Sequence, residues 1–139
     1  MACFQALFTS ASYTEGMAAE AESEQTYTLY RRGIELLEDG DFEHAAEPLA
    51  EAARRAPEKS SVREALGRAY YRAGRYAKAA VEFEAVVETQ HVNDYAHFCL
   101  GRALSMTGEK ARARHHLALA SNLRPDRSDY RFYRRLLDA

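Results

Sequence analysis

Residues 60–93 read SSVREALGRAYYRAGRYAKAAVEFEAVVETQHVN, and the glycines and alanines of this stretch recur at the same spacing on both sides of it. Intervals of 34 residues separate the three glycines Gly33, Gly67 and Gly101. A second glycine follows each of them after seven residues and an alanine after twelve, at Gly40, Gly74, Gly108, Ala45, Ala79 and Ala113. A fixed period of this length is the mark of a repeat protein. Such repeats usually bind other proteins and rarely carry out chemistry.

Each 34-residue unit has the apolar periodicity of two helices. We expect first helices at 26–38, 61–72 and 94–106, and second helices at 41–55, 76–88 and 110–122. Ser61 and Glu64 have the spacing of a capping box, and Asn93 and Asp41 are suited to cap the helices that follow them. The glycines at 40, 74 and 108 fall between paired helices, where a positive φ ends one helix and turns the chain. Turns this short make the paired helices antiparallel.

The two ends of the chain differ from the repeats. Residues 1–25 are small and polar, with a short apolar start followed by four glutamates, which predicts a flexible or weakly helical tail. Residues 128–139 predict one more helix, running to about residue 137, amphipathic and rich in arginine. A solenoid of repeats needs a polar cap over its last apolar face, and this helix is suited to that role.

In this register the chain resembles the tetratricopeptide repeat family, whose unit is a 34-residue helix–turn–helix. The second repeat matches the family pattern through Leu66, Gly67, Tyr70, Gly74, Tyr76, Ala79 and Phe83. Departures from the pattern are Arg32, Leu49, His91, Lys110 and Leu117. The resemblance implies an all-α fold: a right-handed α-solenoid of three repeats (26–59, 60–93 and 94–127) with a C-terminal capping helix.

The glycines at 33, 67 and 101 lie inside predicted helices, where glycine costs about 1 kcal/mol relative to alanine. That cost is tolerated where a neighbouring helix must approach the backbone closely. We expect the alanines at 45, 79 and 113 to be the small partners at these contacts. Pro57 and Pro125 end the second helices of the first and third repeats.

In tetratricopeptide proteins one face of the first helices, at positions 2, 5, 9, 12 and 13 of each repeat, lines a concave groove that receives a partner segment. The resemblance places eleven candidate binding residues there: Tyr27, Tyr30, Ile34, Leu37, Arg68, Tyr71, Arg72, Tyr95, Phe98, Arg102 and Met106. Aromatic side chains and arginine are enriched at binding hot spots. The alternative is that these side chains pack against each other or against the chain's own tail.

Some tetratricopeptide proteins hold the C-terminal carboxylate of heat-shock chaperones with lysine, asparagine and arginine at five positions. Here those positions carry Tyr30, Ile34, Ala65, Tyr95 and Cys99, so this clamp is absent. We expect instead a protein or peptide partner with apolar or aromatic side chains and an acid or two, which would pair with the groove arginines.

Composition narrows the other possibilities. A net charge of −2 in 139 residues gives no reason to expect nucleic acid or an anionic membrane. Cys3 and Cys99 form no metal-binding spacing, and no apolar run approaches the length of a membrane span. The N-terminus lacks the basic start of a signal peptide. We therefore expect a cytoplasmic protein.

Several candidate chemical sites fail on spacing. His115 and His116 are adjacent on a predicted helix, so their side chains diverge, and His91 and His97 flank a helix boundary. The catalytic motifs that carry a glycine loop, a serine nucleophile or a zinc-binding histidine pair do not occur. We expect a non-enzymatic protein with no cofactor and no metal.

The leading hypothesis is a protein–protein interaction module that binds a partner segment in its groove. A second is a self-associating scaffold, in which the acidic N-terminal and basic C-terminal ends stack head to tail, giving a homo-oligomer. A third, less favoured, is nucleic-acid binding by the arginine-rich C-terminal helix. A further hypothesis places Phe4, Leu7 and Phe8 of the tail in the chain's own groove.

Overall fold

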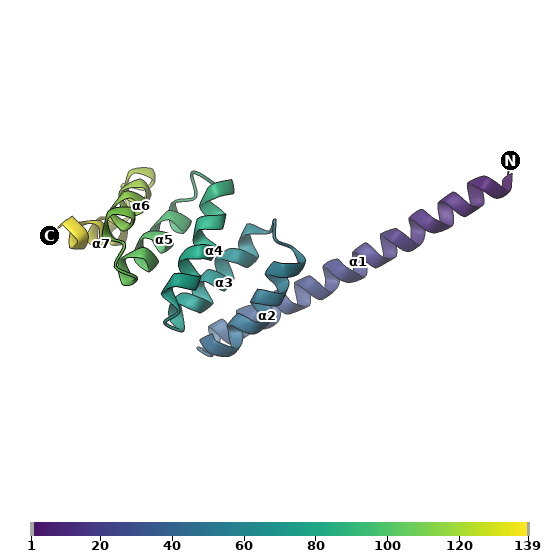
Figure 1. The fold of residues 1–139 in the computed structure, drawn as a ribbon, viewed down its shortest axis with the longest axis horizontal. Helices are drawn as coiled ribbons and strands as arrows, with labels where there is room; N and C mark the ends of the chain where they lie inside the picture. Colours follow the sequence, from purple (N-terminus) through teal and green to yellow (C-terminus); the bar gives the residue numbers. More distant parts are fainter. Residues whose placement is uncertain (1, 139) are drawn as a thin grey trace.

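The computed structural model describes the backbone of residues 2–138 and the side chains of residues 12–138. All regular structure in this part of the chain is helical, in the order α1 (Ala2–Glu38), α2 (Phe42–Arg55), α3 (Ser60–Arg72), α4 (Tyr76–Thr89), α5 (Asp94–Met106), α6 (Lys110–Leu123) and α7 (Ser128–Asp138). The helices stack into an elongated array, from which the first part of α1 projects (Figure 1). None of the described helices is long and apolar enough to cross a bilayer.

Each helix packs mainly against its neighbours in sequence, and α3 also contacts both α1 and α5. The first helices of the three repeats therefore share one side of the array. The turns within the repeats form at the predicted glycines, since Gly40, Gly74 and Gly108 have φ values of 80°, 79° and 86°. This arrangement confirms the α-solenoid of three helix–turn–helix repeats.

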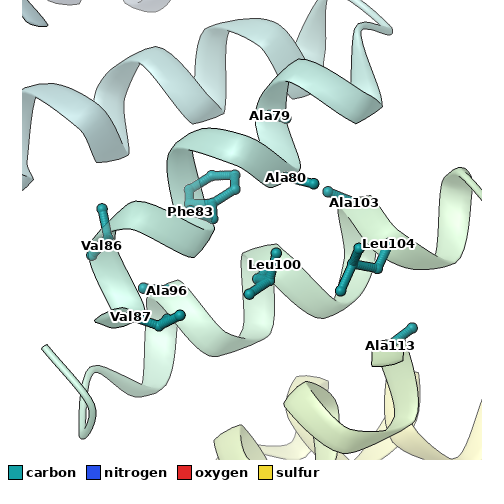
Figure 2. Packing of buried hydrophobic residues seen from close by; sticks show 10 residues of the cluster. All are labelled: Ala79, Ala80, Phe83, Val86, Val87, Ala96, Leu100, Ala103, Leu104 and Ala113. Atoms are coloured by element: carbon teal, nitrogen blue, oxygen red, sulfur yellow. The ribbon is translucent and has the colours of Figure 1, made fainter. Parts of the chain in front are cut away.

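The core is continuous between repeats. Figure 2 shows its central part, where Phe83, Val86 and Val87 of α4 face Leu100 and Leu104 of α5. The alanines in this cluster allow the two helices to approach each other closely. Each repeat therefore buries its apolar face against the next one, and this contact holds a linear array together.

The buried glycines of the first helices make the expected close contacts, but with different partners. A Cβ added at Gly67 would lie 2.8–3.0 Å from ring atoms of Phe83, and one at Gly101 would lie 2.7 Å from Cγ of Leu117. Leu49 fills the same place over Gly33. The large residue at position 24 of each repeat, and not the alanine, is therefore the main partner. Leu49 and Leu117 depart from the family's aromatic residue, yet they occupy its place.

Two of the three predicted helix caps form. The side chain of Asn93 accepts a hydrogen bond from the Ala96 amide at 3.0 Å, and that of Asp41 accepts one from the His44 amide. The prediction of a capping box at Ser61 and Glu64 is wrong. Helix α3 begins one residue earlier, and its N-cap, a lysine, makes no side-chain capping bond. The Glu64 side chain is hydrogen-bonded with Asn93 instead.

The predicted start of the first helix, at residue 26, is also wrong. Residues 2–38 form one helix, where a flexible or weakly helical tail was expected over residues 1–25. No proline interrupts this stretch, and alanine and glutamate, which favour helix, dominate residues 18–24. Once the repeat nucleates the helix, extending it upstream costs little because each added residue gains a backbone hydrogen bond.

The C-terminal helix α7 packs on α6 as the expected cap. Its Tyr130 is fully buried, and the hydroxyl donates a hydrogen bond of 2.7 Å to Oδ2 of Asp94 at the start of α5. The Tyr130 ring also stacks on Phe98, with ring centroids 4.5 Å apart. The cap is thereby joined to both helices of the third repeat.

Candidate functional site

The shared side of the first helices contains a cavity of about 320 Å³, which we call the inner cavity. The end of α1, the middle of α3 and most of α5 supply its walls. Seven of the predicted groove residues line it together: Leu37, Arg68, Tyr71, Arg72, Tyr95, Phe98 and Arg102. A single repeat could not form this cavity, because each repeat contributes only one wall.

Three arginines at the inner cavity lack an acidic partner. Among the described side chains, no carboxylate lies within 4.0 Å of the charged groups of Arg68, Arg72 and Arg102, although nine ion pairs of other arginines and one of a histidine form elsewhere. Arg72 instead lies over the Phe42 ring, 4.6 Å from its centroid, and Arg102 lies 5.0 Å from that of Tyr71. Aromatic faces hold these cations without neutralising them. The inner cavity is therefore positive and partly aromatic.

Helix α7 covers one end of the predicted groove. Phe98 is only 7% exposed, because the rings of Tyr130 and Tyr133 pack against it. Arg102 also lies over Tyr133, with its guanidinium carbon 4.3 Å from the ring centroid. The alternative of internal packing thus describes Phe98, whereas Tyr71, Arg68 and Arg72 remain accessible.

The other predicted groove residues lie outside the inner cavity. Tyr27, Tyr30 and Ile34 line a shallower hollow along α1, beside Glu35 and Glu38. Met106 is exposed at the end of α5 and lines neither hollow.

The sequence argument missed an aromatic residue of the inner cavity and two exposed apolar side chains that lie outside it, on α7. Phe42 belongs to a second helix, so a rule restricted to first helices omits it, yet it lines the inner cavity and holds Arg72. Phe132 and Leu136 of α7 are 50% and 55% exposed. Residue 128 lies one 34-residue interval after residue 94, so these two side chains take positions 5 and 9 of a fourth first helix. That register was a signal that could have found them.

Burial controls the ionisation of the cavity wall. It raises the pKa of Tyr95 above its usual range and that of the Cys99 thiol to about 12. Burial also raises the pKa of Glu64, against the opposing effects of an Asn93 hydrogen bond and of Arg68. Cys99 is therefore a neutral thiol at physiological pH and has no nucleophilic character.

The histidines form a structural pair across α5 and α6. His97 is buried, its Nε2 lies 2.8 Å from the carbonyl oxygen of His91, and its Nδ1 lies 3.0 Å from Nδ1 of His116. The exposed His115 side chain does not diverge from this pair as predicted: its ring lies edge-on to that of His116, with centroids 5.2 Å apart. No cluster of three or more metal-binding side chains occurs among the residues described.

The arginines at the C-terminal end are mostly engaged within the chain. Arg124 pairs with Asp126 at 2.9 Å, and Arg127 pairs with Asp129 at 2.7 Å. Arg131 donates to the carbonyl oxygen of Pro125. These internal contacts favour a structural cap over a surface for nucleic acid.

Comparison with known proteins agrees with the repeat register. A tetratricopeptide repeat family model matches residues 30–94. A search of the curated proteins finds no sequence that matches this chain.

Several solved structures share the fold. The second tetratricopeptide domain of human RPAP3, solved in complex with the HSP70 peptide SGPTIEEVD, is 15% identical, with a TM-score of 0.79 over 85% of this chain and 98% of that one. The C-terminal domain of a putative FK506-binding protein from Plasmodium falciparum is 21% identical, with a TM-score of 0.78 over 85% and 89%. The tetratricopeptide domain of Sgt2 from Aspergillus fumigatus is 16% identical, with a TM-score of 0.73 over 81% and 76%.

The glycine register, the stacked helix pairs, the family model and these structures agree: residues 30–94 match the tetratricopeptide repeat family, and the fold is that of a tetratricopeptide repeat domain.

Proposed function

We propose that this chain is a protein–protein interaction module that binds a segment of a partner protein in the inner cavity. The observation that carries the proposal is the set of three arginines without carboxylate partners beside partly buried aromatic rings in one cavity. The similar domain of human RPAP3 was solved with a peptide, which supports a peptide as the ligand class.

The lining of the inner cavity defines the ligand chemistry. Arg68 and Arg72 are exposed and can each receive a carboxylate. Tyr71 and Tyr95 are partly buried, so they offer ring faces to an apolar or aromatic side chain. The segment that fits combines one or two acids with aromatic or aliphatic anchors. Tyr95 and Cys99 stand where the chaperone-binding clamp has a lysine and an arginine, so a terminal carboxylate is not required.

The expected affinity is modest. Three or four anchors contribute about 1.5–3 kcal/mol each when buried. Association and side-chain ordering then remove several kcal/mol. A dissociation constant near micromolar, equivalent to about −8 kcal/mol, lies at the favourable end of that balance.

A peptide array of segments that combine aromatic residues with acids tests this proposal. Tyr71→Ala and Arg72→Glu should each reduce binding of the captured peptides at least about tenfold, the effect of losing one contact of about 1.4 kcal/mol. Lys110→Glu is the matched control, because it makes the same charge change at an exposed residue outside the inner cavity. Unchanged binding by both cavity variants would contradict the proposal. Phe98 is unsuitable for this test, because its loss would disturb the packing of α7.

A further inference from the structure

The first part of α1 projects away from the repeats (Figure 1). The side chains of residues 12–25, which we call the α1 extension, are exposed, and Gln25 at the end of this segment accepts a hydrogen bond from Arg55 of α2. The α1 extension includes four glutamates, Glu15, Glu20, Glu22 and Glu24, and no basic residue. None of these four forms an ion pair among the described side chains. The α1 extension is therefore an acidic helix with its charge uncompensated.

One face of the α1 extension combines apolar and acidic side chains. Tyr13, Met17, Glu20 and Glu24 are spaced at i, i+4, i+7 and i+11, which places them on one side of a helix. Tyr13 and Met17 are 69% and 56% exposed. Glu22 lies on the opposite side, about 200° around the helix from Glu20. This face has the chemistry that the inner cavity requires: two apolar anchors and two carboxylates.

The charges at the C-terminal end make it a poorer match for this acidic face. Arg124 and Arg127 already pair with neighbouring aspartates. Arg131 and Arg134 donate hydrogen bonds to Pro125 and Asn122, so among the described residues 124–138 only Arg135 is an arginine without such a contact. Arg68, Arg72 and Arg102 of the inner cavity form no ion pair with a described carboxylate, and Glu38 is the one acid among the residues that line it. Charge complementarity therefore directs the α1 extension to the inner cavity.

The α1 extension cannot reach the inner cavity of its own chain in this structure. It is continuous with the helix whose last turns form one wall of that cavity, and it leads away from the array (Figure 1). Folding it back would require breaking α1. The side chains of Phe4, Leu7 and Phe8 lie outside the described residues. A second copy of the chain can present the same face without any change in the helix.

We propose that the α1 extension of one copy docks in the inner cavity of a second copy, with Tyr13 and Met17 against the aromatic wall and Glu20 toward the arginines. Amphipathic helices commonly bind to grooves in this way. The inference rests on the proposed function, since it names a partner for the same cavity. Because donor and acceptor surfaces differ, each dimer keeps one free extension and one free cavity, and copies add head to tail.

Sedimentation velocity of the full chain, from low micromolar to near-millimolar concentration, tests this inference. The average mass should rise with concentration and fall with added salt, which screens the ion pairs. Glu20→Lys should weaken self-association at least about tenfold, as expected for a reversed contact worth 1.4 kcal/mol or more. Glu22→Lys makes the same charge change on the opposite side of the helix and should associate like the wild type. If both variants weakened self-association equally, the face that carries Tyr13, Met17 and Glu20 would not be the docking surface and the inference would be wrong.

Mixing two variants tests the donor and acceptor separately. Glu20→Lys keeps an intact cavity, and Arg72→Glu keeps an intact α1 extension. Each alone should be monomeric at concentrations where the wild type assembles, and an equimolar mixture should form dimers that grow no further. If Arg72→Glu alone still assembles, the contact lies elsewhere on α1 and the inference is wrong.

The outcomes for this inference and for the proposed function can be separated. A wild-type chain that stays monomeric at all concentrations would overturn self-docking. In that case, if the Tyr71→Ala variant no longer binds the peptides that the wild type binds on the array, the inner cavity is still a binding site for other partners. If the same variant binds all peptides unchanged, the proposed function fails as well.

Discussion

Gly67 illustrates how strongly the repeat constrains a single position. It lies inside α3 and is buried, and the Phe83 ring of α4 occupies the space that any side chain would need. Gly16, by contrast, is a helical glycine with no atom within 4 Å of an added Cβ. The two glycines allow packing to be separated from helix propensity.

Gly67→Ala should lower the free energy of unfolding by about 1–3 kcal/mol, because the new methyl group overpacks against the buried Phe83 ring. Gly16→Ala should instead increase helicity, since alanine favours a helix by up to about 1 kcal/mol over glycine. Urea unfolding and far-UV circular dichroism measure the two effects. A Gly67→Ala variant as stable as the wild type would show that α4 can shift to make room.

Acid should destabilise the fold through His116. Burial, with smaller contributions from His97, His115 and Arg112 and an opposing one from Glu84, lowers its pKa to about 4. The unfolded value is about 6.5, so between these values the unfolded state binds more protons than the folded state. Stability conferred by the neutral His116 is therefore present above pH 6.5 and is lost as the pH falls toward 4.

The matched variants His116→Gln and His115→Gln check this effect by urea unfolding at pH 7 and pH 5. His115 is exposed and contributes only a minor part of the lowered pKa of His116, so its variant should lose nearly as much stability on acidification as the wild type. His116→Gln should lose less, because the group that takes up the extra proton on unfolding is gone. Equal losses in all three proteins would mean that other groups control the acid response.

At the level of elements, α7 depends on one face for its attachment. Tyr130→Ala should reduce the free energy of unfolding by about 3–5 kcal/mol, because it removes a fully buried ring and its hydrogen bond to Asp94. Phe132→Ala should cost less than about 1 kcal/mol, since half of that side chain is exposed. Thermal unfolding compares the two variants. If both variants lost a similar amount of stability, α7 would have to pack through a different face from the one that carries Tyr130.

The repeat register predicted the helices and turns well because each unit has the same local signals. The turn glycines and the Asn93 cap act within a few residues, so the sequence reveals them directly. The start of α1 has no such signal, because a helix continues until something stops it. The register also predicted which face Phe98 is on, but it could not show that α7 covers that face.

At the scale of the whole molecule, the repeat array and the α1 extension should be independent in stability. Removing residues 1–20 leaves Gln25, whose side chain accepts a hydrogen bond from Arg55. Within the deleted segment, residues 12–20 are exposed. The thermal midpoint of the array, measured at low concentration, should therefore match that of the full chain. A marked decrease would reveal contacts between the first residues and the repeats.

The unbroken course of α1 from Ala2 to Glu38 has a geometric consequence. A helix advances about 1.5 Å and turns about 100° per residue, so the direction of each side chain on the projecting part is set by counting residues from the first repeat. Inserting seven residues after Gln25 would lengthen the projection by about 10 Å and turn its face by only about 20°, whereas inserting two would turn it by about 200°. The projecting part of α1 can thus be lengthened by seven residues with little change in the direction that its side chains face.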